Sequence, residues 1–292
     1  MKIIFIRIFL FIGAVLPLPV SHGLGYLAGW GLFLFPSHSR RITQVNLALC
    51  LPELGAAEQR KLVRKSLIET GKTIFEAGAL WLRRGESTLR LVKIAQGSDL
   101  VDAALADGKG VILATPHQGA WEAAGLYCAA HYNITCLYRP LKMQQLDALV
   151  TTARGRLGGH YVPANASGIR TLRKKLKQGD AVAMLPDQEP LAGGGVFAPF
   201  FGVPAYSMVL PGRLAEKSGA PLIFVWCERL SWGRGYHLHF RKVPGGAYSK
   251  DPVEAAATVN QVVEDCARTS LAQYQWSYRR FRRRPGGEQE FY

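Results

Sequence analysis

A short apolar run that ends at a proline constrains the fold of this chain more than any other segment. Residues Val111 to Ala114 are all apolar, and Thr115-Pro116 follows them directly. Four apolar residues stopped by a proline are typical of a buried β-strand. The stretch from Trp121 to Ala130 is rich in alanine and predicts a helix. A buried strand followed so closely by a helix indicates a layered α/β domain.

Strands and helices are predicted to alternate along the rest of the chain. We expect further strands near residues 134–138, 181–185, 221–227 and 236–243, and helices near 58–81, 99–106, 144–154, 168–177, 209–218 and 253–273. This alternation predicts an α/β fold with a mixed central sheet flanked by helices. The loop after Ala114 then lies at the carboxyl end of a strand, where α/β sheets usually place their sites.

That loop carries His117, and Glu122 falls in the first turn of the helix that follows. On one continuous helix, residues five apart would point about 140° apart, so the two side chains can meet only if His117 lies in the loop. A histidine whose Nδ1–H is held by a carboxylate has the geometry of a general base. The alternative is a structural histidine, because this spacing also occurs by chance.

The bulk properties indicate one domain with acidic partners. The 292 residues include 48% hydrophobic residues and show no internal repeat or low-complexity linker. A formal net charge of +15 favours lipid headgroups, an acidic protein, a phosphorylated substrate or nucleic acid as partner. The cysteines form no metal-binding or disulfide pattern, which predicts reduced thiols facing the cytosol and no metal: they are Cys50, Cys128, Cys136, Cys227 and Cys266.

The N-terminus predicts membrane attachment. Residues 3–20 are apolar apart from Arg7, and a second apolar block covers 24–35. The first block has nearly the length that spans a bilayer, and Pro17 and Pro19 close it. We therefore expect residues 1–35 to form an apolar membrane-anchoring helix or segments in the interface, and residues 36–292 to form the main domain. A buried core helix and a cleaved signal peptide are the alternatives, although no clear cleavage site follows.

Two basic segments strengthen the expectation of an anionic partner. The predicted helix 168–177 carries five cations opposite an apolar face, and Arg279 to Arg284 are basic except for Phe281. Tyr274 and Trp276 precede that run and suit the headgroup level of a membrane. No nucleic-acid-binding module is recognisable, so we expect no nucleic acid.

Six residues around the loop resemble a known catalytic box. His117-Gln118-Gly119-Ala120-Trp121-Glu122 is similar to the H-x4-D/E box of membrane-bound acyltransferases, in the form found in bacterial lipid A late acyltransferases (lauroyl and myristoyl transferases). Further segments match that family in the same order: Tyr138-Arg139-Pro140, Arg154-Gly155-Arg156, Leu185-Pro186-Asp187-Gln188, Pro199-Phe200-Phe201-Gly202, and Gln273-Tyr274-Gln275-Trp276 running into Arg279-Arg280-Phe281. The resemblance covers nearly the whole chain.

The resemblance implies an enzyme that moves a fatty acyl chain from an acyl carrier protein thioester to a hydroxyl of a lipid A precursor, without a cofactor. His117 would be the base and Glu122 would accept from its Nδ1. Arg154 and Arg156, with Arg139 less favoured, would serve the oxyanion as alternatives to loop N–H groups, and Asp187 and Gln188 would shape the site. No G-x-S-x-G serine is present, so we expect direct transfer.

The expected setting follows from the same resemblance. The implied location is the cytoplasmic face of the inner membrane, and the partners are the carrier protein, an anionic glycolipid acceptor and membrane phospholipids. Two alternatives stay open. One is acyl transfer to another (lyso)phospholipid or glycolipid, and the other is a non-catalytic basic protein of the membrane surface.

Overall fold

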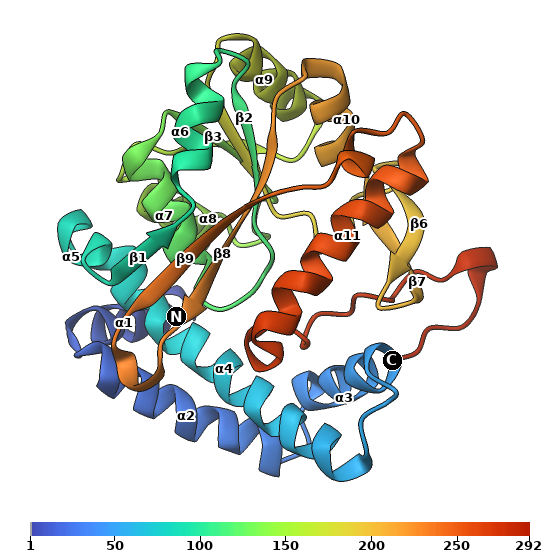
Figure 1. The fold of residues 1–292 in the computed structure, drawn as a ribbon. Coiled ribbons are helices and arrows are strands. Elements are labelled where there is room, and N and C mark those ends of the chain that lie inside the picture. The colour runs from blue at the N-terminus through green and yellow to red at the C-terminus, as the bar shows by residue number, and fades with distance from the viewer. Residues whose placement is uncertain (1) are drawn as a thin grey trace.

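The apolar run that begins at Val111 forms a central strand of a seven-stranded sheet. In the computed structural model, which describes residues 2–292 apart from the side chain of Lys2, the strand order is β1-β9-β8-β2-β5-β3-β4 (Figure 1). The strands are β1 Val92–Gln96, β2 Val111–Ala114, β3 Ile134–Tyr138, β4 His160–Pro163, β5 Ala181–Met184, β8 Leu222–Arg229 and β9 Tyr236–Lys242. Strand β9 runs antiparallel to β8, and the other neighbouring pairs are parallel. The predicted mixed sheet is confirmed.

Alternate residues of the central strands pack against two helical layers. In β2, Ile112 and Ala114 belong to one buried cluster, whereas Val111 and Leu113 belong to the other. The first cluster includes residues of α9 (Ala166–Lys177), α10 (Leu210–Ser218) and α11 (Pro252–Thr269), and the second includes residues of α6 (Asp99–Ala106) and α7 (Trp121–His131). Helix α8 (Gln144–Gly155) lies against α7 and β4. Burial on both faces explains why β2 contains no polar residue.

The N-terminal part forms a helical platform below the sheet in Figure 1. Its longest member is α4 (Ala56–Leu82), and α1 (Lys2–Val15) and α2 (Leu18–Leu34) pack along it. Helices α3 (His38–Cys50) and α5 (Gly85–Leu89) lie near the two ends of α4. The backbones of α2 and α4 touch, because a Cβ on Gly29 would lie only 2.3 Å from Ile68 Cα. Glycine is required where two helix backbones approach so closely.

The single N-terminal helix expected over residues 3–20 is two helices. Helix α1 ends at Val15, and α2 begins at Leu18 with Pro17 as its N-cap. A proline has no N–H to continue the first helix, but its fixed φ suits the start of the next. Within residues 2–292, no helix has both the length and the apolar character needed to cross a membrane.

Several smaller elements were not predicted. They are α3, α5, β1, β4, the hairpin of β6 (Gly195–Phe200) and β7 (Val203–Met208), and the 3-10 turns η1 Ser231–Gly233, η2 Gly245–Tyr248, η3 Leu271–Gln273 and η4 Pro285–Gly287. The expectation that Tyr274 and Trp276 sit at the headgroup level is wrong, since they are only 5% and 1% exposed in the core. The C-terminal segment is therefore part of the folded domain.

Candidate active site

The register of the sheet brings His117 and Asp187 together. Strands β2 and β5 are parallel neighbours, with Ala114 paired to Met184. His117 and Asp187 each lie three residues beyond that pair, so both fall in loops at the same edge of the sheet. The Nδ1 atom of His117 lies 2.8 Å from Asp187 Oδ1, and the His117 backbone N–H donates to Oδ2 across 2.8 Å.

This pairing corrects the expected role of Glu122. We expected Glu122 to accept from His117 Nδ1, but that atom is bound to Asp187. Asp187 is 2% exposed, and burial alone would raise its pKa. The His117 imidazole and the hydrogen bonds from His117 outweigh burial, so the pKa of Asp187 is lowered. An ionised Asp187 keeps the proton on Nδ1 and leaves Nε2 as the nitrogen able to accept another proton.

The loop that carries His117 is held from two sides. The Gly119 N–H donates to Gln273 O at 2.9 Å, and the Ala120 N–H donates to Cys227 O at 3.0 Å. Gly119 has φ +58°, and a Cβ there would lie 1.8 Å from Cys227 O. Only glycine satisfies both constraints. The Gln275 N–H also donates to His117 O at 2.9 Å, so the histidine backbone is fixed on both its polar atoms.

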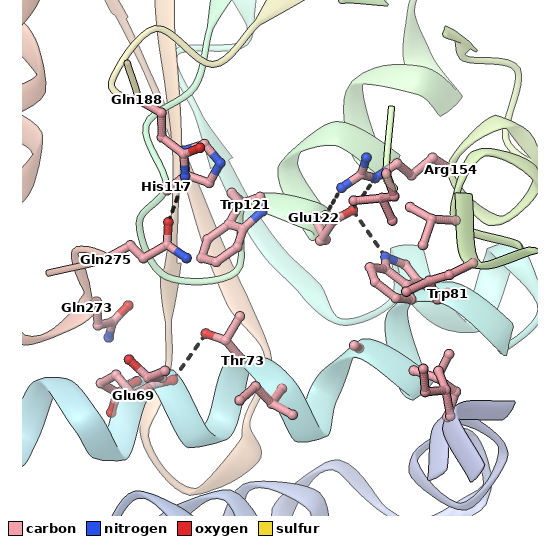
Figure 2. Close-up of a pocket in the computed structure, with 18 of the residues that line it drawn as sticks. Glu69, Thr73, Trp81, His117, Trp121, Glu122, Arg154, Gln188, Gln273 and Gln275 are labelled. Atoms are coloured by element: carbon pink, nitrogen blue, oxygen red, sulfur yellow. Dashed lines mark hydrogen bonds and ion pairs between the residues drawn. The ribbon is translucent and has the colours of Figure 1, made fainter. Parts of the chain in front are cut away.

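Glu122 belongs to a second polar group beside the histidine. Arg154 donates from Nε to Glu122 Oε2 at 2.9 Å and from Nη2 to Oε1, and Trp81 Nε1 donates to Oε2 at 3.1 Å. Figure 2 shows the Trp121 side chain between His117 and Glu122, with Glu122 directed toward Arg154. Burial opposes ionisation of Glu122, but Arg154 lowers its pKa overall. Glu122 is therefore a carboxylate held by a guanidinium.

Both groups open into one cavity of about 540 Å³ between the helical platform and the sheet edge. Its aliphatic and phenylalanine lining residues come from α1, α4 and α8 and from the loop before α8: Ile6, Phe9, Leu10, Ile74, Ala77, Leu141, Leu146 and Val150. Other lining residues carry hydroxyl, amide and carboxylate groups: Ser66, Glu69, Thr70, Thr73, Gln188, Gln273 and Gln275. A cavity of this size and mixed lining suits a ligand with a long apolar part and a polar part.

The other predicted site residues lie in different places. Gln188 lines the cavity and donates to Gln275 Oε1 at 3.0 Å. Arg156 is turned away from the cavity and donates to Trp81 O at 2.6 Å and Leu80 O at 2.7 Å, where it satisfies carbonyls at the end of α4. Arg139 is exposed and is not among the residues that line the cavity. Of the three arginines, only Arg154 therefore lines the cavity with the histidine.

A buried ionic group behind the loop was not predicted. Arg229 donates from Nη2 to the carbonyl of Gly119 at 3.0 Å and from Nε to Glu76 Oε2 at 2.9 Å. The same carboxylate oxygen contacts His22 Nε2 at 2.9 Å and accepts from the Tyr236 hydroxyl at 3.0 Å. Burial opposes ionisation of Glu76, yet Arg229 and His22 lower its pKa to about 2. The group ties the platform to the loop that carries His117. Its only sequence signal is a glutamate and an arginine within apolar segments.

Comparison with known proteins gives a consistent match over the whole chain. Residues 2–283 match the family model described as bacterial lipid A biosynthesis acyltransferase. A lipid A biosynthesis palmitoleoyltransferase of Escherichia coli (strain K12) is 30% identical over 278 residues, which cover 95% of this chain and 90% of that protein. A lipid A biosynthesis lauroyltransferase of the same strain is 30% identical over 273 residues, covering 93% and 88%.

A shorter match is to a protein whose name gives a different lipid. A phosphatidylinositol mannoside acyltransferase of Mycobacterium tuberculosis (strain ATCC 25618 / H37Rv) is 32% identical over 150 residues, covering 49% of this chain and 47% of that protein. The two Escherichia coli matches extend over almost twice that share of the chain.

Proposed function

The chain belongs to the bacterial lipid A biosynthesis acyltransferase family and is an acyltransferase, and on this premise we propose that it moves a fatty acyl chain from an acyl carrier protein thioester to a hydroxyl of a lipid A precursor. The observation that carries the proposal is His117, held by Asp187 and lining a cavity that has both apolar and polar residues. The apolar lining residues suit an acyl chain, and the polar ones suit a glycolipid headgroup.

His117 Nε2 accepts the proton of the acceptor hydroxyl while the hydroxyl oxygen attacks the thioester carbonyl carbon. Asp187, bound to Nδ1, stabilises the imidazolium that forms. When the tetrahedral intermediate collapses, the C–S bond breaks and the thiolate leaving group takes the proton from His117. The acyl chain passes directly to the acceptor, and no acyl-enzyme is formed.

The oxyanion of that intermediate needs hydrogen-bond donors near His117. The backbone N–H groups of residues 117–120 are all used within the protein, by Asp187 Oδ2 and by carbonyls of Pro116, Gln273 and Cys227. Arg154 lines the cavity and is held there by Glu122. A guanidinium has five N–H groups, and Glu122 takes two of them, so Arg154 retains donors for an anion. We assign Arg154 to the oxyanion and Glu122 to the positioning of Arg154.

Attachment to the cytoplasmic face of the inner membrane is also proposed, through α1 and α2 lying in the interface. On α2, His22 faces inward to Glu76, while apolar side chains such as Leu24, Leu27 and Leu34 are exposed. The outer side of α1 is similar, with Phe5, Ile8, Phe11 and Val15 exposed. Such an apolar exterior is costly in water and suits the upper acyl region of a bilayer.

A tryptophan beside α2 also supports the proposal that this side of the protein faces the membrane. Trp232 in η1 is 87% exposed and has φ +58°, a conformation that non-glycine residues rarely adopt. The next residue, Gly233, packs against α2 so closely that a Cβ would lie 2.5 Å from Pro19 N. A strained, exposed indole at this position suits the membrane interface, where tryptophan is enriched.

The proposal is tested by offering the purified protein three acceptors with the same acyl carrier protein thioester. We expect acylation of a lipid A precursor, with far slower acylation of a lysophospholipid and of a mannosylated phosphoinositide. Preferential acylation of either alternative acceptor would replace the assigned substrate. No acylation of any acceptor by the folded protein would contradict the proposed reaction.

A further inference from the structure

A groove separate from the cavity lies at the end of α2, where several arginines contact aromatic rings. It encloses about 460 Å³ between α2 and α4 and is lined by Trp30, Phe33, Leu34, Arg60, Lys61 and Arg64 among others. The Arg64 guanidinium lies 5.2 Å from the Trp30 ring centroid. Those of Arg40 and Arg60 lie 5.5 and 5.9 Å from the Phe33 ring centroid. Three cations from two different helices therefore meet over two adjacent rings.

No acid neutralises these cations. The chain contains no Asp or Glu before Glu53. Across residues 2–292, no ion pair involves Arg40, Arg60, Lys61 or Arg64. Contact with an aromatic face stabilises a guanidinium, but it leaves the positive charge in place. Mutual repulsion among the four cations is relieved by a bound anion.

We propose that this groove binds the phosphate of an anionic phospholipid at the bilayer surface. Arginine binds phosphate oxygens through paired N–H groups, and several arginines together suit a phosphate better than a single carboxylate. The groove also adjoins the apolar exterior of α2, because Leu34 lines it and Phe35 beside it is 70% exposed. A lipid with its phosphate among the arginines places its acyl chains against these apolar side chains. The inference rests on the proposed membrane attachment and not on acyl transfer.

The test is flotation of the full-length protein with phosphatidylcholine vesicles, with and without phosphatidylglycerol. The test variant is Arg60→Gln with Arg64→Gln, since glutamine keeps the helix and removes the charge. The matched control is Arg170→Gln with Arg173→Gln on α9, which removes the same charge from exposed positions. In Figure 1, α9 lies at the opposite end of the molecule from α2. The thermal midpoint of each variant checks folding independently of any enzyme assay.

Each basic residue near an anionic surface contributes about 1 kcal/mol, so the test pair should lower partition into phosphatidylglycerol vesicles roughly thirty-fold. Partition into phosphatidylcholine alone should stay unchanged for the test pair, and the control pair should resemble the wild type on both vesicles. An equal loss of partition in the test pair and the control pair would show that only net charge matters, and it would overturn the proposal. The proposal would also be overturned if vesicle binding were unchanged while the KM for the lipid A precursor in detergent rose, because the groove would then hold the acceptor.

Discussion

Two hydrogen bonds of 2.8 Å join His117 to Asp187, one from the imidazole Nδ1 and one from the backbone N–H. The first sets the orientation and tautomer of the ring, and the second fixes the loop that carries the ring. A single carboxylate therefore positions both the base and its backbone. The residues meet because they follow paired positions of two parallel strands.

Replacing Asp187 with asparagine should remove most of the activity while the protein still folds. The amide replaces one of the two carboxylate oxygens with an NH2 group, so only one of the two N–H groups of His117 keeps its acceptor in place. If its NH2 group faces Nδ1, the proton moves to Nε2 and the base is lost. We expect kcat to fall at least roughly 100-fold, with little change in the KM for the acceptor. Steady-state kinetics measure this, and a variant within threefold of wild type would exclude Asp187 as the orienting group.

Glu122 should be coupled energetically to Arg154 rather than to His117. In the double-mutant cycle of Glu122→Gln and Arg154→Gln, each single change leaves a poorly matched partner behind. The double variant should therefore be more stable than the sum of the two losses predicts, by about 1–3 kcal/mol in the free energy of unfolding. The cycle of Glu122→Gln with His117→Gln is the control and should show little coupling. Strong coupling in the control cycle alone would restore Glu122 as the partner of His117.

The buried Glu76 should make stability fall at acid pH. Its pKa is lowered from 4.5 to about 2 in the folded chain, so its ion pair with Arg229 stabilises the fold fully above about pH 4.5. That contribution is lost as the pH falls toward 2. We expect Glu76→Gln to be less stable at neutral pH and the difference from wild type to shrink across this window. Thermal midpoints measured against pH would contradict this if the difference stayed constant.

The apolar exterior of the platform should be tested by point substitutions. Removing the first 35 residues is not a clean test, because Ile6, Phe9 and Leu10 line the cavity and His22 is bound to Glu76. Trp232→Asn and Leu27→Ser should each weaken partition into neutral vesicles roughly tenfold. Asparagine tolerates the positive φ at position 232. Val253→Ser, which alters an exposed apolar residue of α11, is the control. Equal losses for all three would show that no particular face binds the membrane.

Local sequence patterns predicted most of the sheet and the position of the histidine. The runs of β2, β3, β5 and β8 were recognisable because strands buried on both faces are largely apolar. Strand β9 was recognisable by its alternation of polar and apolar residues. Strand β4 was missed because it is short and half-buried, so its sequence carries no clear alternation. The β6–β7 hairpin contains Pro199 and Pro204, which normally argue against a strand.

The partner of the histidine required information that a local pattern does not contain. Spacing within one loop and helix suggested Glu122, whereas the contact to Asp187 depends on which strands are neighbours and in which register. The same applies to the arginines. Arg154 and Arg156 are two positions apart and look equivalent in sequence, but α8 ends at Gly155 between them, and only Arg154 reaches the cavity.

The basic helix 168–177 shows another limit of local patterns. Its charge suggested a surface for an anionic partner, but α9 leads directly into β5, and the candidate site lies beyond the other end of that strand. The basic end of α9 is therefore at the edge of the sheet remote from His117. Two of the C-terminal arginines form ion pairs within the protein, since Arg282 and Arg283 both pair with Glu189.

The central claim is that His117 is the base for acyl transfer, and turnover of His117→Ala tests it most directly. The measurement is the rate of acyl transfer from an acyl carrier protein thioester to a lipid A precursor, with wild type and variant compared at saturating substrates. The variant's thermal midpoint, measured in parallel, confirms that it is folded. General base catalysis contributes roughly 10²- to 10⁴-fold, so the variant should lose at least that factor in kcat. A folded His117→Ala protein that keeps half of the wild-type rate would contradict the account.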